Sequence, residues 1–316
     1  MNLKVRLSLL AVLALALIAA FMFLHAGGNW SYVLPRRGMK ILAIAVTGAA
    51  IAFSTVVFQT ITNNRILTPS IIGLDSLYML LQTFLIFAYG SMNIAIVNKN
   101  LNFVLSVGLM IVFALVLFKW MFRKEGQNIY YLLLVGIIFG SLFGSMSTFM
   151  EVLIDPTDFL VVQSKMFASF NNVQTGLLTI SIVGMVLVTL YCMRFIKYLN
   201  VISLGRDQAI NLGVPYDYTV KRLLVVVAVL ISIATALVGP ITFLGLLVVN
   251  VAYQMFKTYR HGVLILGSIL IGIIALVGGQ LLVERVFAFS TTISVIINFI
   301  GGVYFLYLLL KERKAW

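Results

Sequence analysis

The sequence predicts an all-α membrane protein of about ten transmembrane helices, forming one transmembrane domain over residues 1–316. Its mean hydropathy is +1.11, and only 10% of its residues are charged, whereas soluble domains carry roughly a quarter. Apolar runs of about 20 residues, long enough to cross a hydrocarbon core of about 30 Å, follow one another along the chain. Backbone polar groups need partners inside lipid, and the ten-residue alternation of a barrel is missing, so these runs are expected to be helices.

The apolar runs and the breaks between them place ten spans, at residues 7–24, 38–61, 71–90, 101–122, 129–150, 175–193, 219–238, 241–256, 262–283 and 292–310. The first span follows Lys4 and Arg6, as in a signal peptide, but its apolar run is longer than the usual core of roughly 7 to 15 residues. We therefore interpret it as a span. The eighth is short and begins beside Gly239 and Pro240, which predicts a broken or half-length helix.

Positive charges predict the orientation, because Lys and Arg near span ends are retained on the cytoplasmic side. With a cytoplasmic N-terminus, most of the 22 Lys and Arg residues fall in inner segments. The outer exceptions are Arg36, Arg37, Lys40, Lys99, Lys165 and Arg285. Both termini are therefore predicted to be cytoplasmic. This bias accounts for the net charge of +13, and no nucleic-acid partner is expected.

The sequence offers no catalytic, cofactor or metal site. Its two histidines, His25 and His261, fall in an outer and an inner loop, too far apart for a metal pair or a triad. The single cysteine, Cys192, excludes an internal disulfide and is expected to pack in the core. A phosphate-binding loop is missing, so any ATP would be bound by another chain. Three outer acids fit a solvated loop better than a metal-collecting cluster: Glu151, Asp155 and Asp158.

The positions of the acids bear on energy coupling. Ion-driven carriers usually keep ionisable residues at mid-membrane, whereas each Asp and Glu here is expected at a span end or in a loop. Asp75 is nearest to an exception, and we interpret it as capping the first turn of a helix, with proton transfer as the alternative. An ion-coupled secondary transporter is the alternative function, and a membrane scaffold is the third.

Two groups of residues interrupt or flatten the spans. After the second span, Asn63, Asn64, Pro69 and Gly73 can stop a helix and turn the chain back. In the fifth span, glycines at intervals of four give one nearly flat face, which either packs closely on a neighbouring helix or lines a passage. These glycines are Gly136, Gly140 and Gly144.

Ordered motifs along most of the chain resemble the FecCD/BtuC-type permeases of ATP-binding cassette (ABC) importers, which take up iron–siderophores and vitamin B12. The motifs are LPRRGMKILAIAVTGAAIAF, then Gln59 and NNRILTPSIIGLDS, then LGRDQAINLGV, VGPITFLGLLV and GGVYFLYLLL. Val249, Asn250 and Tyr253 stand where the family usually has Pro-His-x-x-Arg, and Val303 replaces a proline. These departures make the chain most similar to permeases for ferric catecholate-type siderophores such as petrobactin.

The resemblance implies a BtuC-like type II importer fold and alternating access driven by a separate ATPase. It implies a coupling loop at about 194–218, with Leu204, Gly205, Ala209, Leu212 and Gly213 as its contact set. Apolar residues at 204, 209 and 212 could share one side of a short helix closed by the glycines.

Further partners follow from the same resemblance. An extracellular or periplasmic siderophore-binding protein would dock on Arg36, Arg37 and Arg285, with lipid head groups as the alternative contact for the first two. A second permease subunit, identical or homologous, would complete the channel, with the fifth and tenth spans facing it. The polar turn would lie near the inner gate, through Gln59, Asn64, Pro69 and Gly73.

Overall fold

In the part of the chain that the structure describes, ten apolar helices form the body of the protein, as the sequence predicts. The computed structural model describes residues 2–24, 30–121, 129–171 and 173–312. Within them, seven helices are long and apolar enough to cross a membrane: α1 (Leu3–Phe23), α2 (Trp30–Thr62), α5 (Lys99–Met121), α6 (Ile129–Leu153), α8 (Thr175–Ile202), α10 (Tyr216–Val238) and α12 (His261–Arg285). Three further apolar helices complete the set: α3 (Leu74–Tyr89), α11 (Leu244–Phe256) and α13 (Ile293–Glu312). Short helices connect them: η1 (Pro69–Ile72), α4 (Ile94–Val97), α7 (Pro156–Met166) and α9 (Arg206–Asn211).

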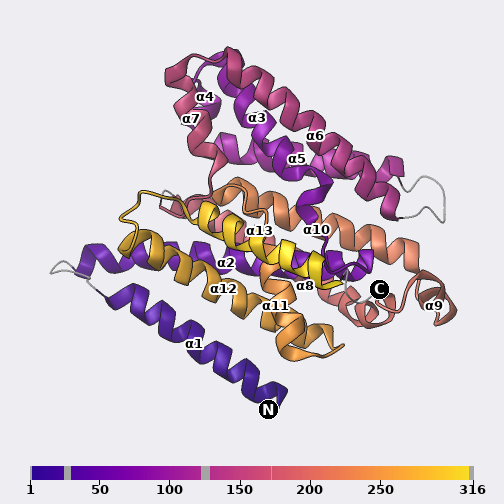
Figure 1. The fold of residues 1–316 in the computed structure, drawn as a ribbon. Helices are drawn as coiled ribbons and strands as arrows, with labels where there is room; N and C mark the ends of the chain where they lie inside the picture. The colour runs from indigo at the N-terminus through magenta and orange to yellow at the C-terminus, as the bar shows by residue number, and fades with distance from the viewer. Residues whose placement is uncertain (1, 25–29, 122–128, 172, 313–316) are drawn as a thin grey trace.

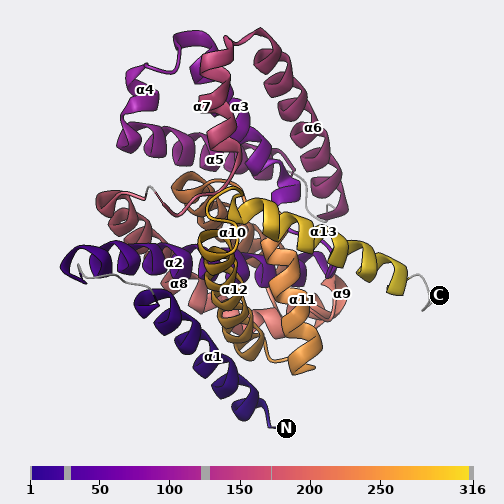
Figure 2. The same cartoon turned by 60° about the vertical axis from the view of Figure 1, so that its left-hand side comes forward.

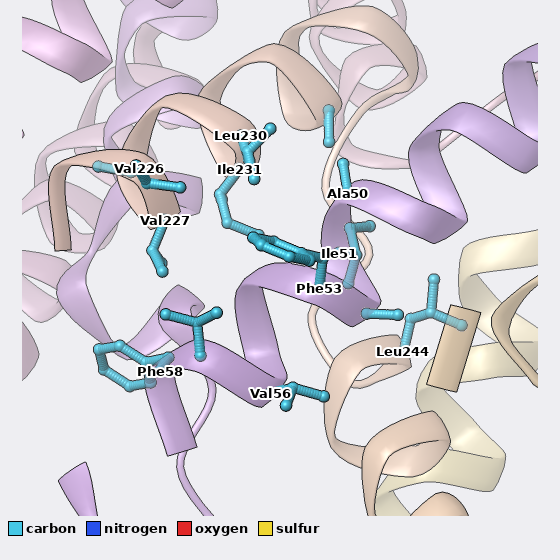
Figure 3. Packing of buried hydrophobic residues seen from close by; sticks show 14 of the residues in the cluster. Ala50, Ile51, Phe53, Val56, Phe58, Val226, Val227, Leu230, Ile231 and Leu244 are labelled. Carbon is cyan, nitrogen blue, oxygen red and sulfur yellow. The ribbon is translucent and has the colours of Figure 1, made fainter. Parts of the chain in front are cut away.

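Helix α2 is the centre of the bundle, and α8, α10, α11 and α12 pack around it (Figures 1 and 2). Small residues let α2 and α12 approach closely, since a Cβ at Gly48 would lie 3.5 Å from the carbonyl carbon of Gly272. Toward α10 the packing is by large apolar side chains, and α11 also approaches closely where Gly245 meets Thr55; Figure 3 shows Phe53, Ile231 and Leu244 in this core. The inward-facing surface of α2 is therefore apolar or small along most of its length.

A second group of helices, α3 to α7, lies together at the top of Figure 1. Its α6 packs on η1 and the start of α3 through glycine, because a Cβ at Gly136 would lie 2.8 Å from the carbonyl oxygen of Ile71. A Cβ at Gly73 would lie 3.1 Å from the backbone nitrogen of Gly140. The regular spacing of glycines in α6 thus serves a backbone-to-backbone contact at two of its three positions.

Several helix termini meet at the end of the bundle that carries α9, here named the α9 end. Arg6 near the start of α1 donates to the carbonyl oxygen of Met255 at the end of α11. Gln254 donates to the Tyr304 hydroxyl of α13 at 2.7 Å. His261 at the start of α12 contacts Asn200 near the end of α8. The start of α1 and the end of α13 therefore lie toward the α9 end, and α7 lies at the opposite end, here named the α7 end (Figure 1).

The observed helix ends differ from the predicted ones mainly where a helix extends beyond an apolar run. Helix α2 begins at Trp30 rather than 38, with Pro35 inside it, and α8 continues to Ile202 rather than 193. Hydropathy marks the hydrocarbon core but not the polar helical turns beyond it, which explains both differences. The prediction of a short eighth segment is confirmed, because the 13 residues of α11 rise only about 20 Å.

Candidate functional site

The loop from Ser203 to Pro215, which contains α9, joins α8 to α10 and forms a compact knob (Figure 1). It is shorter than the predicted 194–218 because α8 takes up the first residues of that range. Gly205 and Gly213 flank the helix with φ of +101° and +82°, and no other described atom would lie within 4 Å of a Cβ at either position. Backbone conformation, rather than crowding, is thus the reason for glycine at both positions.

The carboxyl-terminal end of α9 is closed by a Schellman motif. The backbone N–H of Gly213 donates to the carbonyl oxygen of Ile210 at 2.9 Å, and that of Val214 donates to Ala209 at 3.0 Å. Ala209 and Val214 are both buried, which supplies the apolar contact that accompanies this motif. At the start of α9, Arg206 pairs with Asp217 of α10 at 3.4 Å. The knob is therefore fixed at both of its ends.

Apolar side chains project from this knob. Leu204 is 52% exposed, Ile210 43% and Leu212 64%, while Ala209 is fully buried. The expectation that residues 204, 209 and 212 share one side of the helix is wrong, because Leu204 and Leu212 lie outside the six residues of α9 and Ala209 faces the protein. The arrangement can present separate apolar contacts to another protein while its backbone stays rigid.

At the α9 end, the chain leaves α2 through a second Schellman motif. Asn63 adopts φ of +46°, and the backbone N–H of Asn64 donates to the carbonyl oxygen of Gln59 at 3.1 Å. The Asn64 side chain accepts the backbone N–H of Ile66 at 2.9 Å. The Gln59 amide donates to the carbonyl oxygen of Arg65 at 2.7 Å. These bonds stop the helix and fix the turn that follows it.

Pro69 and Gly73 lie apart from that turn. Residues 64–68 run from the end of α2 into the bundle, where Pro69 starts η1 and Gly73 ends it with φ of +87°. Because Gly73 contacts α6 through Gly140, it belongs to the α3–α6 packing. The four residues predicted for an inner gate therefore divide into one pair at the α9 end, Gln59 and Asn64, and one pair inside the bundle.

Asp75 corrects the expectation that every acid lies at a span end or in a loop. It is the second residue of α3, but it lines a small cavity with Ile51 of α2 and Ile231 of α10, both within their helices. It is the acid in the first turn of α3, as predicted, and it also accepts the Thr235 hydroxyl at 3.0 Å. The predicted span at 71–90 did not indicate that its first residues lie deep in the bundle rather than at its edge.

At the α7 end, the three predicted docking arginines have different surroundings. Arg36 is exposed, with its guanidinium carbon 4.3 Å from the ring centroid of Tyr32. Arg37 donates to three carbonyl oxygens at the end of α1, and Arg285 donates to one of these, that of Leu24, at 2.9 Å. Arg37 and Arg285 thus hold α1 in place, which leaves Arg36 as the arginine most open to a partner.

Arg36 also lines a cavity of about 780 Å³ at the α7 end, together with Lys40, Lys99 and Glu284. Lys40 and Glu284 form an ion pair of 2.8 Å between α2 and α12. An adjoining cavity of about 400 Å³ contains Lys99 and Lys165, and burial together with the nearby charge of Lys99 lowers the pKa of Lys165. This end of the molecule therefore presents clustered positive charge to the solvent.

The three outer acids have separate partners. Asp155 accepts the backbone N–H of Thr157 and caps α7, Asp158 accepts the Ser91 hydroxyl at 2.6 Å, and Glu151 accepts the hydroxyl of a serine one turn earlier in α6. Within the described residues, no three His, Cys, Asp or Glu side chains come close enough to hold a metal ion. His25 lies outside the described residues.

One face of α6 is exposed and partly polar. It forms a shallow groove of about 570 Å³ lined by Ser141, Gly144, Ser145, Thr148, Phe149, Val152 and Leu153. A Cβ at Gly144 would have no described neighbour within 4 Å, unlike one at Gly136. The third glycine of the predicted row therefore lies on the exposed face rather than in the contact with η1.

Sequence reasoning missed a polar cluster at the α9 end. The Asn250 amide donates to the carbonyl oxygen of Arg65 at 2.9 Å, and the Arg65 guanidinium carbon lies 4.7 Å from the ring centroid of Tyr253. His261, predicted in a loop, begins α12 and is only 4% exposed. Asn250 and Tyr253 both depart from the family pattern, and both contact Arg65. Their shared departure was the one sequence signal for this cluster.

Comparisons with known proteins agree with this fold. The chain is 61% identical over 313 residues to the petrobactin import system permease protein YclO of Bacillus subtilis, with 99% of both chains covered. It is 38% identical to the petrobactin import system permease protein FatC of Bacillus anthracis, covering 89% of this chain and 79% of the relative.

A solved structure and a family model also match this chain. A solved structure described as an inward-facing metal-chelate type ABC transporter matches with a TM-score of 0.84 at 20% identity, covering 98% of this chain and 100% of the other. At that identity the match concerns the fold. The profile of the FecCD transport family matches residues 5–311. The chain therefore belongs to the FecCD transport family.

Proposed function

We propose that this chain is the transmembrane permease subunit of an ABC importer that moves a ferric siderophore of the petrobactin type through alternating access. The observation that carries the proposal is the α9 knob, which presents Leu204 and Leu212 on a backbone fixed at both ends. A rigid projection with exposed apolar side chains suits a grip for a soluble partner. The partner would be an ATPase, whose nucleotide-driven closure displaces the knob and shifts the spans.

The cargo proposal depends on relatedness. The 61% identity to a petrobactin import permease extends over nearly the whole of both chains, so the surfaces that face the cargo are expected to be similar. ATP hydrolysis is assigned to the partner chain, since the sequence lacks a phosphate-binding loop. The chain itself is therefore proposed to be a permease without enzymatic activity.

The orientation follows from charge. Lys4, Arg6, Arg206 and Arg222 belong to segments at the α9 end, together with most of the remaining described Lys and Arg residues. Because Lys and Arg are more frequent in the cytoplasmic segments of membrane proteins, we assign the α9 end and both termini to the cytoplasmic side of the bacterial cell membrane. An ATPase in the cytoplasm would then reach the knob.

Two further partners are proposed. The exposed serines and Thr148 on α6 would be unfavourable against lipid, so a second permease subunit, identical or homologous, is the expected neighbour of this face. The fifth and tenth spans, α6 and α13, would line the channel between the two subunits. At the α7 end, exposed Arg36 and the cavity beside it are proposed to receive an acidic surface of a siderophore-binding protein.

Uptake of radiolabelled ferric petrobactin tests the proposal, in iron-starved cells whose own permease for it is deleted and which express this chain with its ATPase and binding protein. Uptake should require this chain, and an ATPase variant that binds but does not hydrolyse ATP should abolish it. Leu212→Asp should also abolish uptake and the co-purification of the ATPase. Leu160→Asp, with the same 64% exposed fraction but at the α7 end, is the matched control for co-purification.

Two results would contradict this function. Uptake that continues with the inactive ATPase but collapses with a proton ionophore would instead support an ion-coupled carrier that uses Asp75. Normal uptake of iron after deletion of the chain, with no other permease for the siderophore present, would support a scaffold.

A further inference from the structure

His261 links three helices at the α9 end, although it was expected in a loop. Its side chain is buried, with 4% exposed. Ring atom Nδ1 lies 2.6 Å from Oδ1 of Asn200 on α8, and Nε2 lies 2.9 Å from Oγ1 of Thr60 on α2. The backbone N–H of His261 also donates to Asn200 Oδ1, at 3.3 Å. The ends of α2 and α8 are therefore joined through the first residue of α12.

Asn200 connects this link to the α9 knob. It lies three residues before Ser203, where α8 ends and the loop begins, and the Ser203 hydroxyl donates to the carbonyl oxygen of Asn200 at 2.8 Å. The helix is unbroken between Asn200 and the knob, so a displacement of α9 along or across the bundle is carried to Asn200. The Asn200 side chain then either shifts relative to His261 or displaces His261 in the same direction.

The contact between His261 and Thr60 depends on the direction of one hydroxyl. Because Asn200 Oδ1 accepts from two groups of His261, Nδ1 carries a hydrogen, and Nε2 of the neutral ring accepts. The Thr60 hydroxyl has one hydrogen and more than one acceptor within reach, among them His261 Nε2 at 2.9 Å and the carbonyl oxygen of Val56 at 2.7 Å, and the Tyr253 hydroxyl also bonds to Thr60. Rotation of one hydroxyl thus exchanges a bond between helices for a bond within α2.

Beyond Thr60, the link continues into the turn after α2 and into α11. Gln59, the neighbour of Thr60, and Asn250 of α11 both donate to the carbonyl oxygen of Arg65, at 2.7 and 2.9 Å. The guanidinium of Arg65 lies over the ring of Tyr253, also on α11. Any shift of the end of α2 is therefore passed to α11 by bonds to one carbonyl group.

We propose that His261 is a positioning residue that transmits displacement of the α9 knob from Asn200 to Thr60, and thereby to the ends of α2 and α11. The inference depends on the proposed function, because it needs a partner that moves the knob. Other buried hydroxyl pairs, such as Thr83 and Ser147 at 2.8 Å between α3 and α6, do not connect to the knob. The contact between Thr60 and His261 is therefore expected to affect transport, whereas the similar contact between Thr83 and Ser147 is not.

The test uses the assembled complex with its ATPase and binding protein in proteoliposomes, and measures ATP hydrolysed per ferric petrobactin transported. Thr60→Val removes the bond between Thr60 and His261, and Asn200→Leu removes both bonds from His261 to Asn200 Oδ1. Each change should raise this ratio at least roughly fivefold, the factor expected for one lost hydrogen bond. Thr60→Ser keeps the hydroxyl and should retain the ratio of the unmodified complex. Thr83→Val removes a comparable buried hydroxyl elsewhere and should also leave the ratio unchanged.

A second measurement needs no variant, so it does not depend on whether a substituted chain folds. In the unmodified complex, trapping the ATPase with nucleotide should change amide hydrogen exchange both in residues 200–215 and in residues 59–65. A change in the first segment without one in the second would overturn the link. So would an unchanged ratio in Thr60→Val and Asn200→Leu, or an equal rise in Thr83→Val.

Different results would contradict the proposed function and the role of His261. If the unmodified complex hydrolyses ATP and transports but the variants keep its ratio, the inference is wrong and the proposed function stands. If the unmodified complex shows no ATP-dependent uptake, the proposed function is wrong, and the link is overturned with it, since there is then no displacement to transmit.

Discussion

Arg37 of α2 donates from Nη1 to the carbonyl oxygen of Leu24, 2.9 Å away, and so caps the carboxyl-terminal end of α1. The same nitrogen lies 2.9 Å from the carbonyl oxygens of Phe21 and Met22, two of the groups that the last turn of a helix leaves without partners. A cation at this place also complements the negative end of the helix dipole. The bond explains how α1, which is little buried, is attached at the α7 end.

Arg37→Ala should therefore lower the stability of the protein by about 1–2 kcal/mol, because it removes charged hydrogen bonds to partly buried carbonyl groups. The measurement is the thermal unfolding of the purified protein in nanodiscs. Arg36→Ala is the matched control, and its stability should stay within about 0.5 kcal/mol of the unmodified protein, since Arg36 is exposed. Equal effects of both changes would contradict the capping role of Arg37.

The glycines of α6 should differ sharply in their tolerance of a methyl group. Gly136→Ala places a Cβ 2.8 Å from the carbonyl oxygen of Ile71 and 2.9 Å from the Cα of Ile72, so the helix must move away. We expect a loss of about 1–3 kcal/mol, as for overpacked cores. Gly144→Ala, two turns along on the same helix, should be nearly neutral in the isolated chain. Thermal unfolding of the two variants would refute the assignment if their order were reversed.

At the α9 knob, substitution of glycine should affect the partner more than the fold. Gly213→Ala forces a residue with a Cβ into φ of +82° and should strain the loop by about 1–2 kcal/mol. Gly213→Asn should be milder, because asparagine tolerates this conformation. Gly176→Ala, at an open helical position of α8, is the control. Co-purified ATPase is expected to fall in the order Gly176→Ala, Gly213→Asn, Gly213→Ala.

Arg36→Glu should weaken docking of the siderophore-binding protein, because it reverses an exposed charge beside a basic cavity. An effect of about 1 kcal/mol, or roughly fivefold in affinity, is expected at low salt and should shrink as the salt concentration rises. The affinity is measured by titrating binding protein onto the permease in nanodiscs. Lys4→Glu, at the α9 end, should leave it unchanged. An affinity independent of both salt and charge at residue 36 would exclude this role.

Much of the fold could be predicted because segments that cross lipid must be apolar and must satisfy their own backbone hydrogen bonds, which makes them helices. The ten apolar helices, the short α11 after Gly239 and the stop at Asn63 each have a local signal in hydropathy or turn residues. The predicted glycines at the ends of α9 both have positive φ, a conformation that favours glycine. Local chemistry was sufficient for these features.

The remaining features depend on contacts between distant parts of the chain. Nothing near Arg37 or Arg285 in the sequence indicates that both donate to the last carbonyl groups of α1. The inward position of Ala209 depends on how α9 lies against α8 and α10, and the depth of Asp75 depends on η1 entering the bundle. A single sequence contains no direct record of such packing.

The most direct test of the central claim is the accessibility of a cysteine at position 212. Cys192 is the only native cysteine and is fully buried, so Leu212→Cys introduces one exposed thiol. In inside-out vesicles, binding of the ATPase should protect this thiol from maleimide labelling, and a short bismaleimide should join it to an accessible cysteine of the ATPase. Leu160→Cys should be labelled only from the opposite side, with or without the ATPase. Labelling of Leu212→Cys that the ATPase does not change, or that occurs in intact cells with an impermeant reagent, would contradict the account.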